Sequence, residues 1–149
     1  MTLLYPDSDI PFHPNPGWFL GAFNCYDREE TLGEILNRYN PLAPAQLQAL
    51  YDAYVFNEFG EQLGFTSVHR AAMATNLIAA LSETKHDFAV YLAIDESEEE
   101  WCFPSVWTFS RPRYPFEQAY LALLRHWGVE LAAIGVALPS PRQLGIGES

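Results

Sequence analysis

Four stretches of the chain repeat apolar residues at the spacing of an amphipathic helix. They cover residues 31–40, 44–59, 68–81 and 115–127. Apolar side chains three or four positions apart share one face of a helix. Prolines at the second and fourth starts, and Gly128 after the last stretch, are typical helix boundaries. We therefore predict four helices.

The third of these helices is apolar on nearly every side. Its apolar stripe at helical spacing consists of Ala71, Ala72, Thr75, Ile78 and Ala79. Three further apolar side chains lie off this stripe, namely Met73, Leu77 and Leu81. Polar residues seven apart form one narrow strip, made of His69, Asn76 and Glu83. A helix with so little polar surface is predicted to be central and buried on most sides.

Strand-like patterns occupy other parts of the chain. Two apolar, aromatic-rich runs, 88–94 and 101–109, flank six residues of which five are acidic, which predicts a β-hairpin with an acidic tip. Residues 18–25 predict an N-terminal strand, and residues 129–138 predict either a C-terminal strand or a short helix. Since strands and helices do not alternate, we expect an α+β fold with an antiparallel sheet packed against about four helices.

The length of 149 residues fits a single domain that spans 1–149. Four prolines within residues 1–17 predict an extended arm, and residues 139–149 predict a flexible tail. No apolar run is long enough to cross a membrane, and the N-terminus lacks the pattern of a secretory signal, so we expect a cytoplasmic protein. Cys25 and Cys102 are expected as buried free thiols, although the sequence leaves open whether they pair.

The charge is strongly unequal, with 19 acidic and eight basic residues and a formal net charge of -11. Such a field repels nucleic acid and attracts basic surfaces, although acidity also increases solubility. The charge therefore argues against nucleic acid and favours a protein partner with a basic surface.

No motif for metal binding, nucleophilic catalysis or phosphate cradling occurs. The four histidines are scattered through the sequence at His13, His69, His86 and His126. None of them has the spacing of metal ligands, and the chain contains no CxxC, GxSxG or Walker-type motif. We expect no metal and no cofactor, and we favour a non-enzymatic role while leaving enzymatic activity open.

Residues 59–70 resemble the turn of a helix-turn-helix motif, and the predicted hairpin would follow it as a wing. This resemblance implies a winged-helix-like, DNA-associated protein. However, Arg70 stands where the motif places a buried Val or Ile, and the net charge opposes DNA. We therefore rank DNA binding third among the hypotheses.

The leading hypothesis is a small acidic protein-interaction module, such as an inhibitor, immunity or anti-defence factor, that binds a basic surface on a target protein. Charge would speed its encounter with the target, and an apolar anchor would slow release. The predicted binding residues are the carboxylates Asp95, Glu96, Glu98, Glu99 and Glu100, with Trp101 or Tyr91 as the anchor.

A ligand-binding or enzymatic α+β domain is the second hypothesis. Its pocket would lie between the sheet and the third and fourth helices. Arg111, Arg113 and Tyr114 would hold an anionic group there, because guanidinium groups bind planar anions with two hydrogen bonds. The polar strip on the third helix would line the same cavity.

Overall fold

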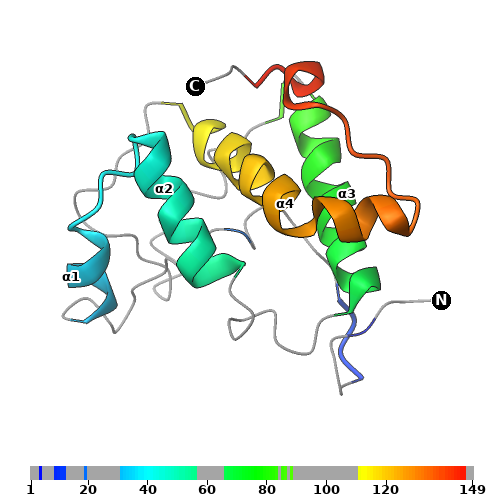
Figure 1. Cartoon of the computed structure of the whole chain (residues 1–149), viewed down its shortest axis with the longest axis horizontal. Helices are drawn as coiled ribbons and strands as arrows, with labels where there is room; N and C mark the ends of the chain where they lie inside the picture. The colour runs from blue at the N-terminus through cyan, green and yellow to red at the C-terminus, as the bar shows by residue number, and fades with distance from the viewer. Residues whose placement is uncertain are drawn as a thin grey trace.

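The fold was examined in a computed structural model that describes residues 4, 9–12, 19, 31–56, 66–83, 85, 86, 88 and 111–146. Its elements, in order, are α1 (Leu32–Leu36), α2 (Pro44–Leu50), η2 (Tyr51–Val55), α3 (Ser67–Ser82), α4 (Tyr114–Ala133) and η4 (Pro141–Leu144). The π-helical turn η2 continues α2 directly, and η4 is a short 3-10 helix. Figure 1 shows the arrangement of these helices.

The predicted α+β class is wrong. In the described part of the chain 66% of residues are helical and none forms a strand or sheet. Leu4 and Pro11 form an isolated antiparallel bridge. Phe19 and Phe88, which belong to two predicted strands, lie in 3-10 turns. The rest of the hairpin, 89–94 and 101–109, lies outside the described residues.

Of the two alternatives predicted for residues 129–138, the strand is wrong, because α4 continues through Gly128 to Ala133 and makes residues 129–133 helical. The residues after Gly128 are mostly Glu, Leu and Ala, which favour helices. The helix ends at Gly135, whose φ of 88° is the left-handed conformation typical of a helix end. The amide of Val136 donates to Leu131 and that of Gly135 donates to Ala132, as in a Schellman motif.

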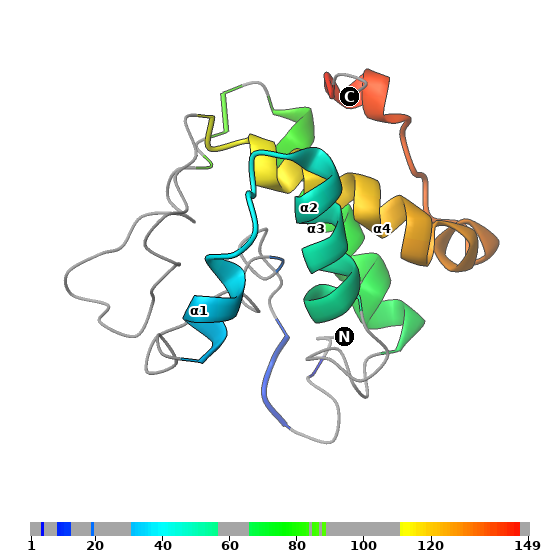
Figure 2. The ribbon, with the colours of Figure 1, turned by 60° about the vertical axis from the view of Figure 1, so that its left-hand side comes forward.

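The central helix is α4, not the third helix as predicted. It contacts both α2 and α3, and Figures 1 and 2 show it between them. Six of its side chains have no solvent exposure, namely Phe116, Ala119, Tyr120, Ala122, Leu123 and Leu131. Each large apolar side chain buried in this way contributes about 1.5–3 kcal/mol to folding. The interior of the protein is therefore organised around α4.

The buried side chains of α3 lie mostly off the predicted stripe, although Ala71, Ala72 and Ile78 of that stripe are partly buried against the core. The buried residues of α3 are His69, Met73, Ala74, Leu77, Ala80 and Leu81, whereas Thr75 and Ala79 are exposed. Thr66 caps the helix, and its side chain accepts a hydrogen bond from the amide of His69. His69, predicted on a polar strip, is only 5% exposed, and its Nε2 lies 2.6 Å from the Leu4 carbonyl oxygen.

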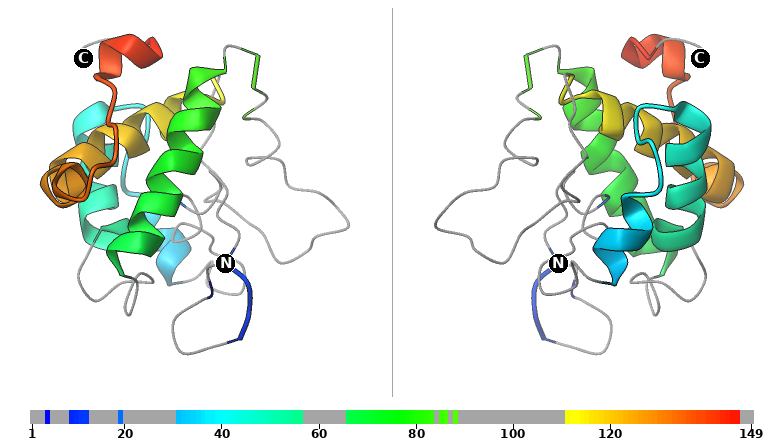
Figure 3. Two further views of the ribbon diagram at one scale, coloured as in Figure 1. Left: turned by 90° about the vertical axis from the view of Figure 1, so that its right-hand side faces the viewer. Right: turned by 90° about the vertical axis from the view of Figure 1, so that its left-hand side faces the viewer.

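The segment predicted as a flexible tail packs against the helices. Leu144 and Ile146 are buried, and the Tyr120 hydroxyl donates to the carbonyl oxygen of Pro139 at 2.5 Å. Figure 3 shows η4 beside the C-terminal end of α3. This position brings residues 141–145 next to the start of α4.

Candidate functional site

The start of α4 places a glutamate inside the protein beside two arginines. Pro115 lies in the first turn, where a missing N–H breaks no helical hydrogen bond. The amide of Glu117 donates to the Arg113 carbonyl oxygen at 3.0 Å. Arg113 and Glu117 are thus four positions apart, a spacing at which side chains on a helix meet.

The Glu117 carboxylate accepts hydrogen bonds from Arg111 and Arg113. Arg111 Nη2 lies 3.1 Å from Oε1 and 3.3 Å from Oε2, and Arg113 Nε lies 3.0 Å from Oε2. Only 6% of the Glu117 side chain is exposed, compared with 63% for Arg111 and 24% for Arg113. A carboxylate this deeply buried needs such partners to remain charged.

A wall opposite these residues is formed by η4. Arg113 Nη2 donates to the carbonyl oxygen of Leu144 and ties η4 to the start of α4. The side chains and amides of Ser140 and Gln143 bond reciprocally as a capping box. Because these contacts fix both ends of the short helix, they also fix the position from which the exposed Arg142 extends.

A pocket of about 460 Å³ lies between the end of α3, the start of α4 and η4. Its lining consists of Leu81, Ser82, Arg111, Arg113, Glu117, Arg142, Gln143, Leu144 and Gly145. Among the described residues of this lining, three arginines and one carboxylate sum to a formal charge of +2, in a chain of net charge -11. The volume falls within the usual range for small-molecule sites, roughly 300–1,000 Å³.

The structure brings together some of the predicted site residues. Arg111 and Arg113 share the pocket, whereas Tyr114 does not line it. Burial, and after it the charge of Glu117, raises the pKa of Tyr114 above its usual value of 10.0, so this phenol is neutral at pH 7. The polar strip of α3 is likewise absent from the pocket lining.

The remaining predicted site residues lie outside the part of the chain that the structure describes. They are Tyr91, Asp95, Glu96, Glu98, Glu99, Glu100 and Trp101, and the same holds for Cys25 and Cys102.

Sequence reasoning missed two charged members of the pocket, Glu117 and Arg142. The four-residue spacing of Arg113 and Glu117 was a usable signal, since opposite charges at this spacing pair on a helix. Arg142 gave no comparable signal, because it is 29 positions from Arg113 in the sequence and reaches the pocket only through the folding of η4.

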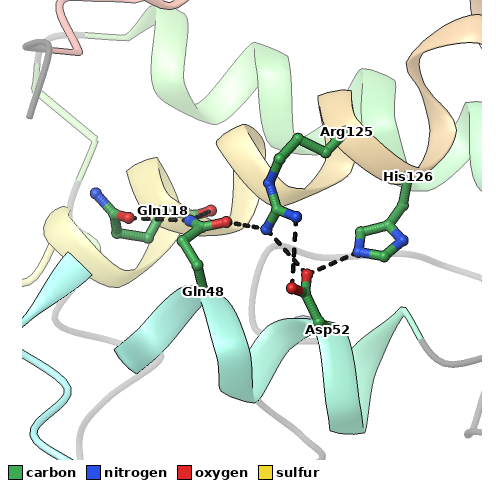
Figure 4. Close-up of polar contacts among 5 residues, drawn as sticks. All are labelled: Gln48, Asp52, Gln118, Arg125 and His126. Atoms are coloured by element: carbon green, nitrogen blue, oxygen red, sulfur yellow. Dashed lines mark hydrogen bonds and ion pairs between the residues drawn. The ribbon is translucent and has the colours of Figure 1, made fainter. Parts of the chain in front are cut away.

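A second polar cluster joins η2 to the middle of α4 (Figure 4). Asp52 Oδ1 lies 2.9 Å from Arg125 Nη2 and 2.7 Å from His126 Nε2. Arg125 also donates to the Gln48 side chain, and Gln48 Nε2 donates to the backbone and side-chain oxygens of Gln118 at 2.8 and 2.9 Å. These contacts link two helical segments more than 60 residues apart in the sequence.

This second cluster has the features of a structural clamp. Burial pushes the pKa of Asp52 upward, but the hydrogen bonds and charges of His126 and Arg125 outweigh it and lower that pKa below 3.8. The His126 ring is stacked on Phe56, with ring centres 5.1 Å apart. Every polar side chain in the cluster thus has a partner within it, and we assign it no ligand.

The side chains that a helix-turn-helix would present to DNA are already engaged. Arg70 Nη1 lies 2.9 and 3.1 Å from the two carboxylate oxygens of Glu130, and its guanidinium lies 5.8 Å from the centre of the Trp127 ring. His69 is buried. The start of α3 therefore lacks the open basic groups that bind phosphates.

Among the residues that the structure covers, no group of three or more His, Cys, Asp or Glu side chains is arranged to hold a metal ion. Within the same residues, no helix combines the length and apolar character required to cross a membrane. Comparison with known proteins finds no matching protein family, no matching curated protein and no matching solved structure.

Proposed function

We propose that the protein binds a small anionic ligand in the pocket between α3, α4 and η4. The observation that carries this proposal is the formal charge of +2 on the pocket lining in an acidic chain. This proposal keeps the anionic ligand of the second hypothesis from the sequence and replaces its α+β architecture with a helical one.

Two physical arguments support an anion at this position. The guanidinium group is planar, always charged and weakly hydrated, so it suits carboxylate and phosphate groups better than an ammonium does. In addition, charges farther than the Debye length, about 8 Å at physiological salt, are largely screened. The charges of the lining therefore act on a bound ligand more strongly than charges that lie beyond this distance.

Calorimetric titration with acetate, citrate, sulfate and phosphate tests the proposal. We expect one-to-one binding of at least one anion, and a loss of roughly tenfold or more in Arg142→Gln, because hydrogen bonds to charged groups contribute about 1.5–3 kcal/mol. Arg38→Gln is the matched control, since it removes the same charge from an exposed residue outside the pocket. Failure of every anion to bind, or equal losses in both variants, would contradict the proposal.

A second proposal follows from how charge is divided along the chain. Five of the 19 acidic residues lie within the six residues 95–100, which contain no basic residue. This concentration supports the hypothesis that residues 95–100, with Trp101 or Tyr91 as anchor, bind a basic surface on a partner protein.

A variant in which Glu96, Glu98, Glu99 and Glu100 are replaced by alanine tests the second proposal. The wild type and this variant are compared in a pull-down from the native host, beside a control in which Asp9, Glu34, Glu83 and Glu130 are alanine. We expect a partner with a basic surface that the first variant loses and the control retains. Retention by both variants would remove residues 95–100 from the interface.

A further inference from the structure

We propose that His126 is a nucleophilic side chain that accepts a phosphoryl group on its ring nitrogen Nδ1. This inference concerns the second polar cluster, in the middle of α4, and makes no use of the anion pocket at the start of that helix (Figure 4). The side chains of the cluster all have partners within it, but one of its nitrogen atoms does not.

The hydrogen bond to Asp52 determines which nitrogen of His126 is open. Asp52 Oδ1 lies 2.7 Å from Nε2, and the lowered pKa of Asp52 keeps its carboxylate ionised at neutral pH. An ionised carboxylate only accepts hydrogen bonds, so Nε2 carries the hydrogen. In a neutral imidazole the lone pair then lies on Nδ1.

The open nitrogen Nδ1 has no hydrogen-bond partner within the described part of the chain. Figure 4 shows it on the side of the ring that faces away from Asp52. Because 31% of the His126 side chain is exposed, part of the ring is open to solvent. An imidazole lone pair in such a position is available to attack an electrophile.

The ring of His126 is also held in one orientation. It lies within 8° of parallel to the ring of Phe56, and its partner Asp52 is itself bonded to Arg125 Nη2 at 2.9 Å. A carboxylate fixed in this way orients an imidazole and stabilises the positive charge that develops on the ring when its other nitrogen forms a bond. A ring oriented by a third group is the usual arrangement of a reactive histidine.

The two other histidines that the structure describes are arranged differently. His69 is buried, and its Nδ1 and Nε2 lie 2.9 Å from Thr66 Oγ1 and 2.6 Å from the Leu4 carbonyl oxygen. His86 uses Nδ1, the atom that is open in His126, to contact Glu83 at 3.2 Å. Among these three histidines, His126 is therefore the one expected to react at Nδ1.

The place of His126 within α4 favours phosphoryl transfer over acyl transfer. Acyl transfer forms a negatively charged oxygen that is commonly stabilised by free backbone amides. In the middle of a helix the amides are used by the helical hydrogen bonds, so α4 offers none at this position. Phosphoryl transfer depends mainly on the position of the nucleophile and on nearby positive charge. Arg125, which bonds to the same carboxylate as His126, supplies a cation.

The proposed donor is a phosphoramidate, in which phosphorus is bonded to nitrogen. The lone pair of Nδ1 forms a bond to phosphorus while the phosphorus–nitrogen bond of the donor breaks, and the leaving amine keeps the electron pair of that bond. Nε2 retains its hydrogen, so the product ring gains a positive charge that Asp52 balances. The step consumes no oxidant, reductant or metal ion.

The test is incubation of the full chain with phosphoramidate at neutral pH, followed over time by mass spectrometry that locates the label on individual histidines. We expect His126 to be labelled roughly tenfold or more faster than His13, His69 or His86, because it combines an open nitrogen with a fixed carboxylate. In concentrated urea the four rates should become similar, since the folded arrangement is lost.

Two matched carboxylate variants separate a reactive histidine from one that is merely exposed. Asp52→Asn should slow the labelling of His126 roughly tenfold or more, because the carboxylate both orients the ring and stabilises its developing charge. Glu34→Gln, an exposed change on α1, should leave the rate within about twofold of wild type. Circular dichroism checks that each variant is folded, and if Asp52→Asn is not, the comparison of the four histidines in the wild type still decides.

Three outcomes would overturn the proposal. They are the absence of label on His126, equal labelling of His126 and another histidine in the folded protein, and an unchanged rate in folded Asp52→Asn. None of these results depends on whether the pocket at the start of α4 binds an anion, so the two proposals fail separately.

Discussion

The polar cluster at the start of α4 and the polar cluster at its middle use the same kinds of side chain for different purposes. At the start of α4, a buried carboxylate on the helix itself, Glu117, is bonded by arginines that precede it. In the middle of the helix, the carboxylate of Asp52 comes from η2 and is 42% exposed, and the basic groups belong to α4.

The two clusters differ in the charge that remains after their ion pairs have formed. In the first cluster one carboxylate is shared by two arginines beside a pocket, whereas in the second cluster one carboxylate offsets Arg125 and also accepts from His126. An ion pair can thus neutralise charge while it joins two helices. It can also hold arginines in position beside a pocket, which we propose binds an anion. The burial of the carboxylate and the number of arginines around it distinguish the two cases.

The largest expected effect on stability comes from Glu117→Gln. Removing this charge leaves Arg111 and Arg113 without their buried partner, and the loss of one member of a buried ion pair costs about 3 kcal/mol. Urea denaturation measures the change in the free energy of unfolding. Glu34→Gln, an exposed change on α1, is the control and should stay within about 0.5 kcal/mol of wild type.

A smaller effect is expected for Asp52→Asn. Because Asp52 and Arg125 are both more than 40% exposed, the pair resembles a surface salt bridge, which contributes about 0.2–1 kcal/mol. A double-mutant cycle with Arg125→Gln in urea denaturation isolates the coupling of the two side chains. A loss of stability as large as that expected for Glu117→Gln would contradict the inference, drawn from solvent exposure, that the Asp52 pair contributes less than the Glu117 pair.

The smallest effect is the acid dependence of that clamp. The pKa of Asp52 is lower in the folded protein than its ordinary value of 3.8, so the stability it contributes is complete above that value and disappears as pH falls through the lowered folded pKa. Thermal melts of wild type and Asp52→Asn between about pH 6 and about pH 2 should therefore converge at the acid end. A difference that widens with acid would contradict the assigned direction of the pKa.

The sequence predicted the helices better than it predicted their faces. The start of α3 after Thr66 and the start of α4 at Pro115 agree with the structure to within one residue, because capping residues and proline act locally. The predicted burial of α3 on most sides was wrong, since the sequence does not show which of its apolar positions are covered, and that depends on packing against α4.

The end of α4 shows the limit of reading glycines from sequence alone. Gly128 and Gly135 both follow apolar helical segments, but only Gly135 adopts a positive φ. A residue in the left-handed conformation ends the helix, and the amino-acid sequence alone does not show which glycine adopts that conformation. The predicted strand at 129–138, and with it part of the α+β assignment, followed from choosing the wrong glycine.

The candidate site was predicted in part. Arg111 and Arg113, which are close in sequence and flank a proline, were predicted to hold an anionic group, and both line the pocket. The pocket itself also needs the end of α3 and η4, which are distant in sequence, and no local pattern indicates that η4 folds back onto α4.

The contribution of η4 to the pocket has a consequence for the order of events during synthesis. Chains fold progressively as they leave the ribosome. The clamp around Asp52 can close once residue 126 has emerged, but the pocket has no second wall until residues 141–145 follow. A nascent chain would therefore acquire its joined helices before it acquires the complete pocket.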